Sequence, residues 1–183
     1  SLIKKSRQIH ATTLLANYVS WLLIFNDKIN IGYVSPNRAS NTHFLNLVNE
    51  SIRNFNFNIT PRVNNTREIR LNNDSTIFVM GDNVSNLCGK SLNILIFDEA
   101  VYLKNFNEFY KNAIFNMEGD FKIIINSTPK SCDKFHYIYE DSIRGKNDYK
   151  SLTITTKDKY RSIYGGDYLE KYHTPDINEQ VAA

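Results

Sequence analysis

An apolar run that ends in two adjacent carboxylates is the feature that constrains this chain most. Residues 94 to 97 read Ile-Leu-Ile-Phe, and Asp98 and Glu99 follow them directly. Such a run is typical of a strand buried on both faces of a sheet. Two carboxylates at its end are typical of a site for nucleotide hydrolysis. We expect Asp98 to bind Mg²⁺, directly or through water, and Glu99 to orient and deprotonate the attacking water.

A site of this kind also needs a loop that binds the phosphates of the nucleotide. Residues 4 to 13 (Lys-Lys-Ser-Arg-Gln-Ile-His-Ala-Thr-Thr) stand between a predicted strand and a predicted helix. In a P-loop, the backbone N–H groups at this position cradle the phosphates and a Ser or Thr hydroxyl binds Mg²⁺. Thr12 is placed to be that metal ligand. The residues expected to hold the nucleotide are Lys5, Ser6, Arg7, Gln8, Ile9, His10, Ala11, Thr12 and Thr13.

The loop departs from the usual P-loop at two positions. His10 takes the place of the glycine, and Ala11 takes the place of the lysine. The glycine position often needs a positive φ, which histidine is among the residues to tolerate. Lys5, at the start of the loop, can fold back over the phosphates and replace the missing cation. The alternative is that Lys5 is an ordinary solvated lysine at the end of a strand.

A second Gly-Lys pair, Gly89-Lys90, does not fit the P-loop pattern. The pattern needs a glycine five residues before the pair, where this chain has Val84. A predicted buried strand, rather than a helix, follows Ser91. We interpret the pair as part of a turn.

A further apolar strand ends in polar residues that belong to the same predicted site. Asn126, Ser127 and Thr128 follow the apolar residues of that strand. The hydroxyl groups of Ser127 and Thr128 can sense the γ-phosphate. This second strand end argues against the alternative that Asp98 and Glu99 are only a helix cap or a salt-bridge pair.

Predicted strands and helices alternate along the chain. Apolar periodicity predicts helices at residues 12 to 25, 39 to 55, 106 to 117 and 132 to 143. Apolar runs predict a first strand that ends near Lys4 and further strands at residues 29 to 35, 92 to 97, 121 to 126 and 152 to 155. The turn-forming residues 72 to 74 predict a β-hairpin of residues 67 to 71 and 76 to 80, while residues 56 to 66 are predicted to form a loop.

This alternation predicts an α/β fold, namely a three-layer P-loop NTPase core. Its mostly parallel sheet would carry helices on both faces and contain an inserted β-hairpin. We expect the core to cover residues 1 to 156 and a loosely structured extension to cover residues 157 to 183.

Length and composition exclude other classes of protein. A chain of 183 residues is long enough to bury a core without disulfides, and Cys88 and Cys132 form no disulfide or metal-binding framework. The longest apolar stretch, Val19 to Phe25, is too short to cross a bilayer. A net charge of +3 permits contact with nucleic acid but does not indicate a dedicated DNA-binding module. We therefore expect a soluble protein of a reducing compartment.

Three motifs together resemble the ATPase domain of the large terminase subunit of tailed bacteriophages. They are residues 6 to 13, residues 95 to 100 (Leu-Ile-Phe-Asp-Glu-Ala) and residues 124 to 129 (Ile-Ile-Asn-Ser-Thr-Pro), and the resemblance covers about residues 1 to 155. The family's P-loop usually reads Ser-Arg-Gln-x-Gly-Lys-Thr-Thr, its second motif ends in Asp-Glu-Ala, and its coupling motif reads Thr-Thr-Pro. The resemblance implies a motor, dependent on ATP and Mg²⁺, that packages double-stranded DNA.

The resemblance also implies partners and a location. The motor would form a homo-oligomeric ring at the portal protein of an empty capsid in the host cytoplasm, together with the small terminase subunit. Arg7 matches the family's P-loop arginine, which has been proposed to act as an arginine finger in some members. Some terminases keep a lysine at the front of the loop, where Lys5 stands. Many relatives have an arginine where this chain has Cys88.

Two parts of the family have no match in this sequence, the C-terminal nuclease and the adenine-contacting segment before the P-loop. We therefore expect the fragment alone to be a monomer, to leave DNA uncut, and to hydrolyse ATP weakly or not at all. One alternative is a degenerate P-loop module that binds DNA or partner subunits without hydrolysis, which the loss of the P-loop glycine and lysine would favour. A superfamily 2 helicase core also contains Asp-Glu-Ala but needs an intact Gly-Lys-Thr loop.

Overall fold

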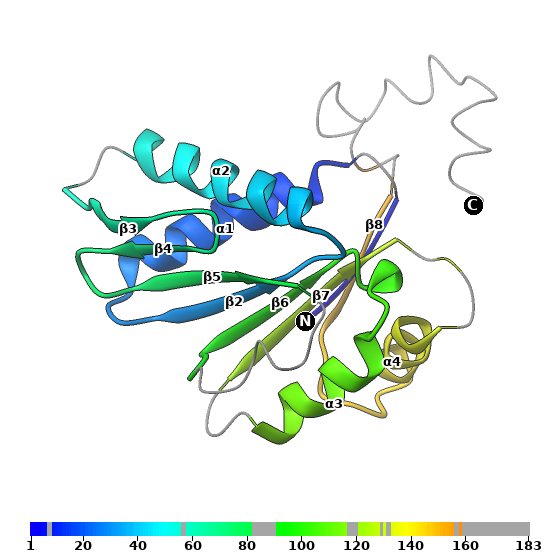
Figure 1. The fold of residues 1–183 in the computed structure, drawn as a ribbon. Coiled ribbons are helices and arrows are strands. Elements are labelled where there is room, and N and C mark those ends of the chain that lie inside the picture. The colour runs from blue at the N-terminus through cyan, green and yellow to red at the C-terminus, as the bar shows by residue number, and fades with distance from the viewer. Residues whose placement is uncertain are drawn as a thin grey trace, which may run out of the picture.

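One open sheet forms the centre of the molecule (Figure 1). The computed structural model describes residues 1–6, 9–55, 58–81, 91–116, 121–128, 130, 133–155 and 158. The sheet has eight strands in the order β3-β4-β5-β2-β6-β7-β1-β8. The strands are β1 (Leu2–Lys5), β2 (Asn30–Val34), β3 (Pro61–Asn64), β4 (Glu68–Leu71), β5 (Thr76–Met80), β6 (Ile94–Asp98), β7 (Lys122–Ser127) and β8 (Ser151–Ile154).

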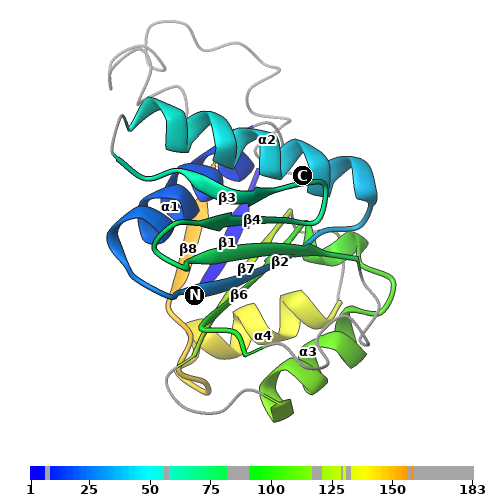
Figure 2. The same ribbon diagram turned by 60° about the vertical axis from the view of Figure 1, so that its left-hand side comes forward.

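Helices cover both faces of the sheet (Figure 2). On one face lie α1 (Ala11–Phe25) and α2 (Arg38–Asn54), and on the other lie α3 (Phe106–Asn116) and α4 (Lys134–Ile143). A short 3-10 helix, η2 (Ala100–Tyr102), follows β6. This arrangement confirms the predicted three-layer α/β fold.

The apolar sequence of β6 explains why helices cover both faces of the sheet. All five of its residues are buried. Ile94 and Ile96 pack into the core beneath α1 and α2, whereas Leu95 and Phe97 pack into the core beneath α3 and α4. Successive side chains of a strand point to opposite faces, so a strand that is apolar at every position needs a core on each side.

The sheet is parallel except at one edge. The pairs β5 with β2, β2 with β6, β6 with β7, β7 with β1, and β1 with β8 are all parallel. The hairpin of β4 and β5 was predicted correctly, and Asp74 in its turn has a positive φ of 63°. The prediction of a loop at residues 56 to 66 was wrong in part, because β3 lies there and pairs antiparallel with β4.

Helix α1 presents a row of large apolar side chains to solvent. Leu14, Tyr18 and Trp21 are 60%, 40% and 47% exposed, and they recur at the spacing of one helix face. The rings of Tyr18 and Trp21 are stacked with centroids 6.3 Å apart. The opposite face of α1, which includes Leu15, packs into the core against α2.

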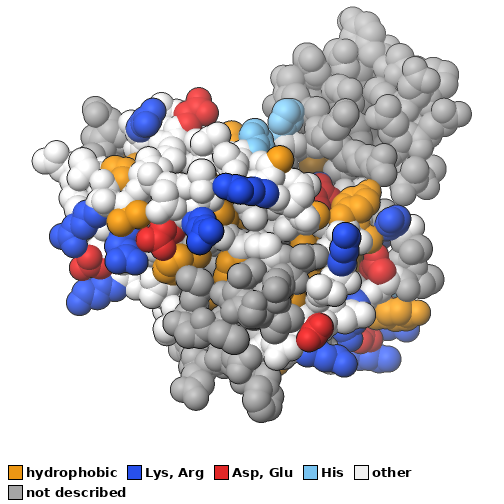
Figure 3. All heavy atoms as spheres, in the orientation of Figure 1, with side chains coloured by type: hydrophobic (Ala, Val, Ile, Leu, Met, Phe, Trp, Pro, Cys, Tyr) orange, Lys and Arg blue, Asp and Glu red, His pale blue; other side chains and the backbone are white. Residues whose placement is uncertain are grey.

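Charged side chains are mixed in sign on the face drawn in Figure 3. At the β-hairpin edge, Arg62 pairs with Asp74 at 2.9 Å, and Arg70 lies 3.7 Å from Glu68. Exposed ion pairs of this kind contribute little to stability. None of the helices in the described part of the chain has the length and hydropathy that a membrane span requires. The predicted extension, residues 157 to 183, lies outside the described residues apart from Asp158.

Candidate nucleotide site

The predicted site residues gather at one edge of the sheet. Strands β1, β7 and β6 are neighbours and parallel, so their carboxyl ends lie together. In the register of these strands, Asp98 is aligned with Asn126, and Lys4 is aligned with Ser127. Helix α1 starts at Ala11, a few residues after the end of β1. The fold therefore brings the predicted phosphate loop, which follows β1, to the same edge of the sheet as the polar residues at the ends of β6 and β7.

Asp98 is held by four hydrogen bonds. Its Oδ2 atom accepts from the hydroxyl of Thr12 at 2.9 Å and from the hydroxyl of Tyr33 at 2.7 Å. Its Oδ1 atom accepts from Asn126 Nδ2 at 2.5 Å and from the backbone N–H of Glu99 at 3.0 Å. Asp98 is 3% exposed. A buried carboxylate needs such partners, and these fix both its oxygens in place.

Lys5 and Glu99 form an ion pair at the ends of β1 and β6. Lys5 Nζ lies 2.5 Å from Glu99 Oε1, and the Lys5 side chain is only 6% exposed while that of Glu99 is 33% exposed. Lys5 is therefore not the solvated surface lysine of the alternative interpretation. Glu99 has a left-handed backbone with φ 51° and ψ 47°. This conformation is uncommon for a residue other than glycine, and such residues cluster at functional sites.

The loop between β1 and α1 adopts a left-handed turn at the position of the expected glycine. His10 has φ 57° and ψ 28°, and its carbonyl accepts the backbone N–H of Leu14 at 3.1 Å as α1 begins. Ser6 ends the strand pairing by donating its N–H to the carbonyl of Ile154 at 3.0 Å. Arg7 and Gln8 lie outside the described residues. The predicted need for positive φ at His10 is confirmed.

The remaining loop residues flank the start of α1. Ile9 is partly buried, Ala11 is buried, and Thr12 and Thr13 are partly buried in the first helical turn. Of these side chains, Thr12 is the one whose hydrogen bond to Asp98 places it in the site.

The end of β7 contacts the segment that carries Glu99. The hydroxyl of Thr128 lies 3.5 Å from both Glu99 Oε2 and Lys5 Nζ. The hydroxyl of Ser127 points elsewhere, because it accepts the backbone N–H of Val101 at 3.1 Å and donates to the carbonyl of Thr128 at 3.3 Å. Thr128 is thus the hydroxyl of this pair that faces the two charged groups. Ser127 instead ties β7 to η2.

The oxygen atoms of Thr12 and Asp98 suit a magnesium ion. Mg²⁺ prefers hard oxygen ligands and is usually bound in nucleotide sites by one or two protein groups together with phosphates and water. Thr12 and Asp98 supply a hydroxyl and a carboxylate that lie 2.9 Å apart. Within the described residues, no group of three or more His, Cys, Asp or Glu side chains could hold a metal ion by itself. The donor set therefore fits Mg²⁺ bound jointly with a nucleotide.

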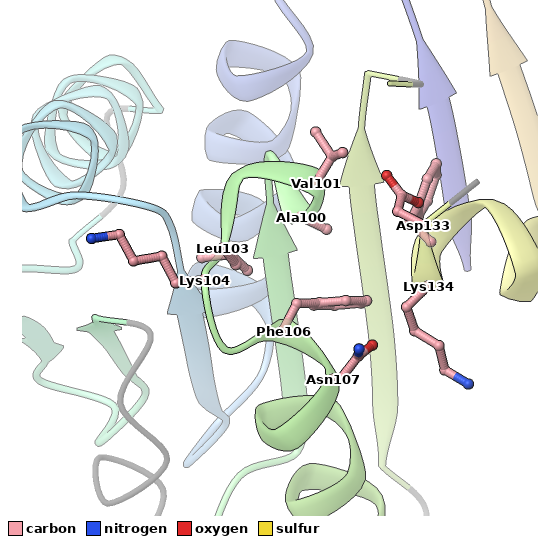
Figure 4. A pocket seen from close by; sticks show the side chains of 9 residues that line it. Ala100, Val101, Leu103, Lys104, Phe106, Asn107, Asp133 and Lys134 are labelled. Carbon is pink, nitrogen blue, oxygen red and sulfur yellow. The ribbon is translucent and has the colours of Figure 1, made fainter. Parts of the chain in front are cut away.

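A small pocket lies next to the segment that follows Glu99 (Figure 4). It has a volume of about 120 Å³ and is bordered by Val101 of η2, Phe106 at the start of α3, and Asp133 and Lys134 at the start of α4. The side chain of Asp133 caps α4 by accepting the backbone N–H of His136 at 2.8 Å. Lys5, Thr12 and Asp98 do not border this pocket. It is separate from the phosphate loop.

Sequence reasoning missed two residues that contact Asp98. Asn126 belongs to a recognised motif, but its contact with Asp98 was not predicted. The sequence feature that could have indicated this contact is an amide side chain near the end of an apolar strand. Tyr33 gave no signal, because tyrosine is common in strands. Burial, and then the charge of Asp98, raises the pKa of the Tyr33 hydroxyl far above its ordinary value.

A comparison with protein families identifies the chain. The family model described as terminase large subunit, T4likevirus-type, N-terminal, matches residues 2–182. The chain belongs to this family. This membership confirms the resemblance to large terminases that the three sequence motifs indicated.

Solved structures of large terminases have the same fold. The ATPase domain of the large terminase of Thermus phage P74-26 superposes with a TM-score of 0.72 at 16% identity, covering 98% of this chain and 85% of that chain. The large terminase of a thermophilic bacteriophage, solved in complex with ADP, gives a TM-score of 0.71 at 15% identity, covering 97% of this chain and 46% of that chain. This terminase N-terminal domain thus spans about half of the second protein.

Proposed function

We propose that this terminase domain binds and hydrolyses ATP to drive double-stranded DNA into a procapsid. The observation that carries the proposal is that Lys5 and Thr12 meet Asp98 and Glu99 at one edge of the sheet, although the two pairs lie far apart in the sequence. Supporting this, the large terminase of the thermophilic bacteriophage has been solved with ADP and with ATP-gamma-S. A structure described as the Phi-28 gp11 DNA packaging motor also shares the fold, with a TM-score of 0.55 at 14% identity, over 98% of this chain and 63% of that chain.

In this proposal the phosphates of ATP lie against the loop from Lys5 to Thr13. Backbone N–H groups at the start of α1 face the phosphates, where the helix dipole favours negative charge. Lys5 supplies the cation that Ala11 cannot supply. The ion pair with Glu99 already holds the Lys5 ammonium at the carboxyl ends of the strands. Arg7 contributes a second positive charge as an arginine finger.

Glu99 acts as the general base of hydrolysis. It orients a water molecule and takes one of its protons while the water oxygen attacks the γ-phosphorus, and the bond to the β,γ-bridging oxygen breaks with release of ADP and phosphate. Thr128, whose hydroxyl lies 3.5 Å from Glu99 Oε2, senses the γ-phosphate through that hydroxyl. Ser127, which accepts the backbone N–H of Val101, links the presence or absence of the γ-phosphate to the position of η2.

Thr12 and Asp98 would hold Mg²⁺ in this scheme. When bound, the ion would supply positive charge that offsets the negative charge developing on the phosphates. The role of the protein is to keep the two oxygen donors in one position. The four hydrogen bonds to Asp98 provide that rigidity.

The proposal extends to domain organisation, partners and location. Residues 1 to 156 form the ATPase core, and residues 157 to 183 form an extension of it. The partners are double-stranded DNA, the portal protein, the small terminase subunit and further copies of the same chain in a ring. The site of action is the procapsid portal in the host cytoplasm.

Steady-state ATP turnover by the full-length protein, measured with and without double-stranded DNA, tests this function. We expect turnover that requires Mg²⁺ and Glu99 and that increases when DNA is added. Nucleotide binding without any turnover, in the presence of both DNA and portal, would favour the non-hydrolysing module instead.

A further inference from the structure

We propose that Tyr33 is a positioning residue for the Mg²⁺ site and acts through Asp98 on the hydroxyl of Thr12. The inference rests on the proposed function, because it concerns the metal that accompanies the nucleotide. It adds a residue of β2, outside the recognised motifs, to the machinery of the site.

Tyr33 and Thr12 bond to the same carboxylate oxygen. The Tyr33 hydroxyl lies 2.7 Å from Asp98 Oδ2, and the Thr12 hydroxyl lies 2.9 Å from it. Tyr33 itself is completely buried. Three strands or helices therefore meet at one oxygen atom, since Tyr33 belongs to β2, Asp98 to β6 and Thr12 to α1.

The direction of each hydrogen bond follows from the chemistry of the groups. An ionised carboxylate only accepts, so both hydroxyl groups must donate to it. A tyrosine phenol carries its proton at neutral pH, so at 2.7 Å from Asp98 Oδ2 the Tyr33 hydroxyl acts as a donor. Thr12 has a single hydroxyl proton, and it gives that proton to Asp98. The lone pairs of Thr12 then face away from the carboxylate, where a cation can use them.

The position of the Tyr33 hydroxyl is itself fixed. The ring of Tyr33 stacks on the ring of Phe44, with centroids 3.6 Å apart and planes 7° from parallel. Phe44 is a completely buried residue of α2. The packing of α2 on the sheet therefore determines where the phenol donates. Through its hydrogen bond to Asp98 Oδ2, Tyr33 restricts the position of that oxygen and thereby the position of the Thr12 hydroxyl.

Tyr33→Phe removes the hydroxyl and leaves the stacked ring in place. Groups that orient metal ligands typically contribute about 10- to 100-fold to metal affinity. In the full-length protein we expect Tyr33→Phe to raise, by about that factor, the Mg²⁺ concentration that half-saturates binding of a fluorescent ATP analogue. Affinity for the same analogue in EDTA should stay unchanged. Binding of Mn²⁺ in the presence of ADP, followed by electron paramagnetic resonance, should weaken in parallel.

Tyr110→Phe is the matched control. The hydroxyl of Tyr110 also lies in the interior, 3.1 Å from that of Tyr149, but neither group contacts Asp98. It should leave the Mg²⁺ dependence unchanged. An unchanged Mg²⁺ midpoint in Tyr33→Phe would overturn the inference, and so would an equal loss of affinity with Mg²⁺ and in EDTA, which indicates a general structural role. If the wild-type protein bound the analogue without any dependence on Mg²⁺, the proposed function would fail together with this inference.

Discussion

The ammonium group of Lys5 and the carboxylate of Glu99 lie 2.5 Å apart and are each other's counter-ion. They come from β1 and from the residue after β6, which β7 separates in the sheet. The pair places the cation that we assign to the phosphates next to the base that we assign to the water. Removing either partner therefore has consequences for the other.

Lys5→Ala should lower the turnover of the full-length protein by about 10² to 10³. A positioned cation stabilises the charge that develops on the phosphates, and Ala11 cannot replace it. Lys4→Ala is the control, because Lys4 Nζ lies 5.2 Å from the ring centroid of Tyr139 rather than at Glu99. Lys90→Ala should also lose little. Similar small losses in all three variants would disprove the role of Lys5.

Glu99→Gln should abolish turnover and preserve binding, since the base acts on water rather than on the nucleotide. The expected loss is at least about 10², measured as single-turnover release of phosphate. Asp98→Ala should instead weaken Mg²⁺-dependent binding. Glu108→Gln, on the exposed side of α3, serves as the control and should behave like the wild-type protein. Wild-type turnover by Glu99→Gln would show that the base has been assigned wrongly.

Substitutions at His10 should depend on backbone conformation more than on side-chain chemistry. His10 has φ 57°, which glycine adopts freely and which a β-branched residue strongly disfavours. We expect His10→Val to have a free energy of unfolding about 1–2 kcal/mol lower than His10→Gly, measured by urea denaturation. His43→Val, at an exposed position within α2, controls for the change of residue type. If His10→Val lowered the free energy of unfolding less than His43→Val does, the left-handed conformation of His10 would be contradicted.

Two buried tyrosines, Tyr33 and Tyr110, and the partly buried Tyr149 predict a loss of stability at high pH. Burial raises the pKa of Tyr33, Tyr110 and Tyr149 above their ordinary value of 10.0. The unfolded chain therefore loses these protons at lower pH than the folded protein does. The contribution of these tyrosines to the free energy of unfolding is therefore complete below pH 10.0 and decreases as the pH rises above that value.

Urea denaturation at several alkaline pH values, followed by circular dichroism, measures this loss. The free energy of unfolding of Tyr149→Phe should fall less steeply with pH than that of the wild-type protein. Tyr137→Phe, at a side chain that is 56% exposed, should keep the wild-type slope. Identical slopes in all three proteins would contradict the prediction.

The sequence predicted the parallel part of the sheet because its strands are apolar runs. In β6 and β7, apolar residues continue until Phe97 and Ile125, and polar residues follow at the predicted strand ends. Strand β3 could not be predicted in this way. Its residues Pro61 to Asn64 are mostly exposed and show no apolar alternation, so pairing with β4 determines its conformation.

The site was predictable where residues are neighbours in a motif and not where the fold brings them together. Asp98 and Glu99 could be assigned from the strand end that they follow. The contact of Lys5 with Glu99 was not predicted, although Lys5 was assigned to the phosphates. Tyr33 could not be assigned, because the sequence does not show that β2 lies beside β6.

The exposed row on α1 gives the protein a built-in optical probe. Trp21 is the only tryptophan in the sequence, so intrinsic indole emission comes from one known position. It lies ten residues after the first residue of α1, about 15 Å along the helix axis. Its ring contacts Tyr18 and Phe25 and is 47% exposed. Any rotation or shift of the helix that begins at the phosphate loop can thus be followed by fluorescence, without attaching a dye.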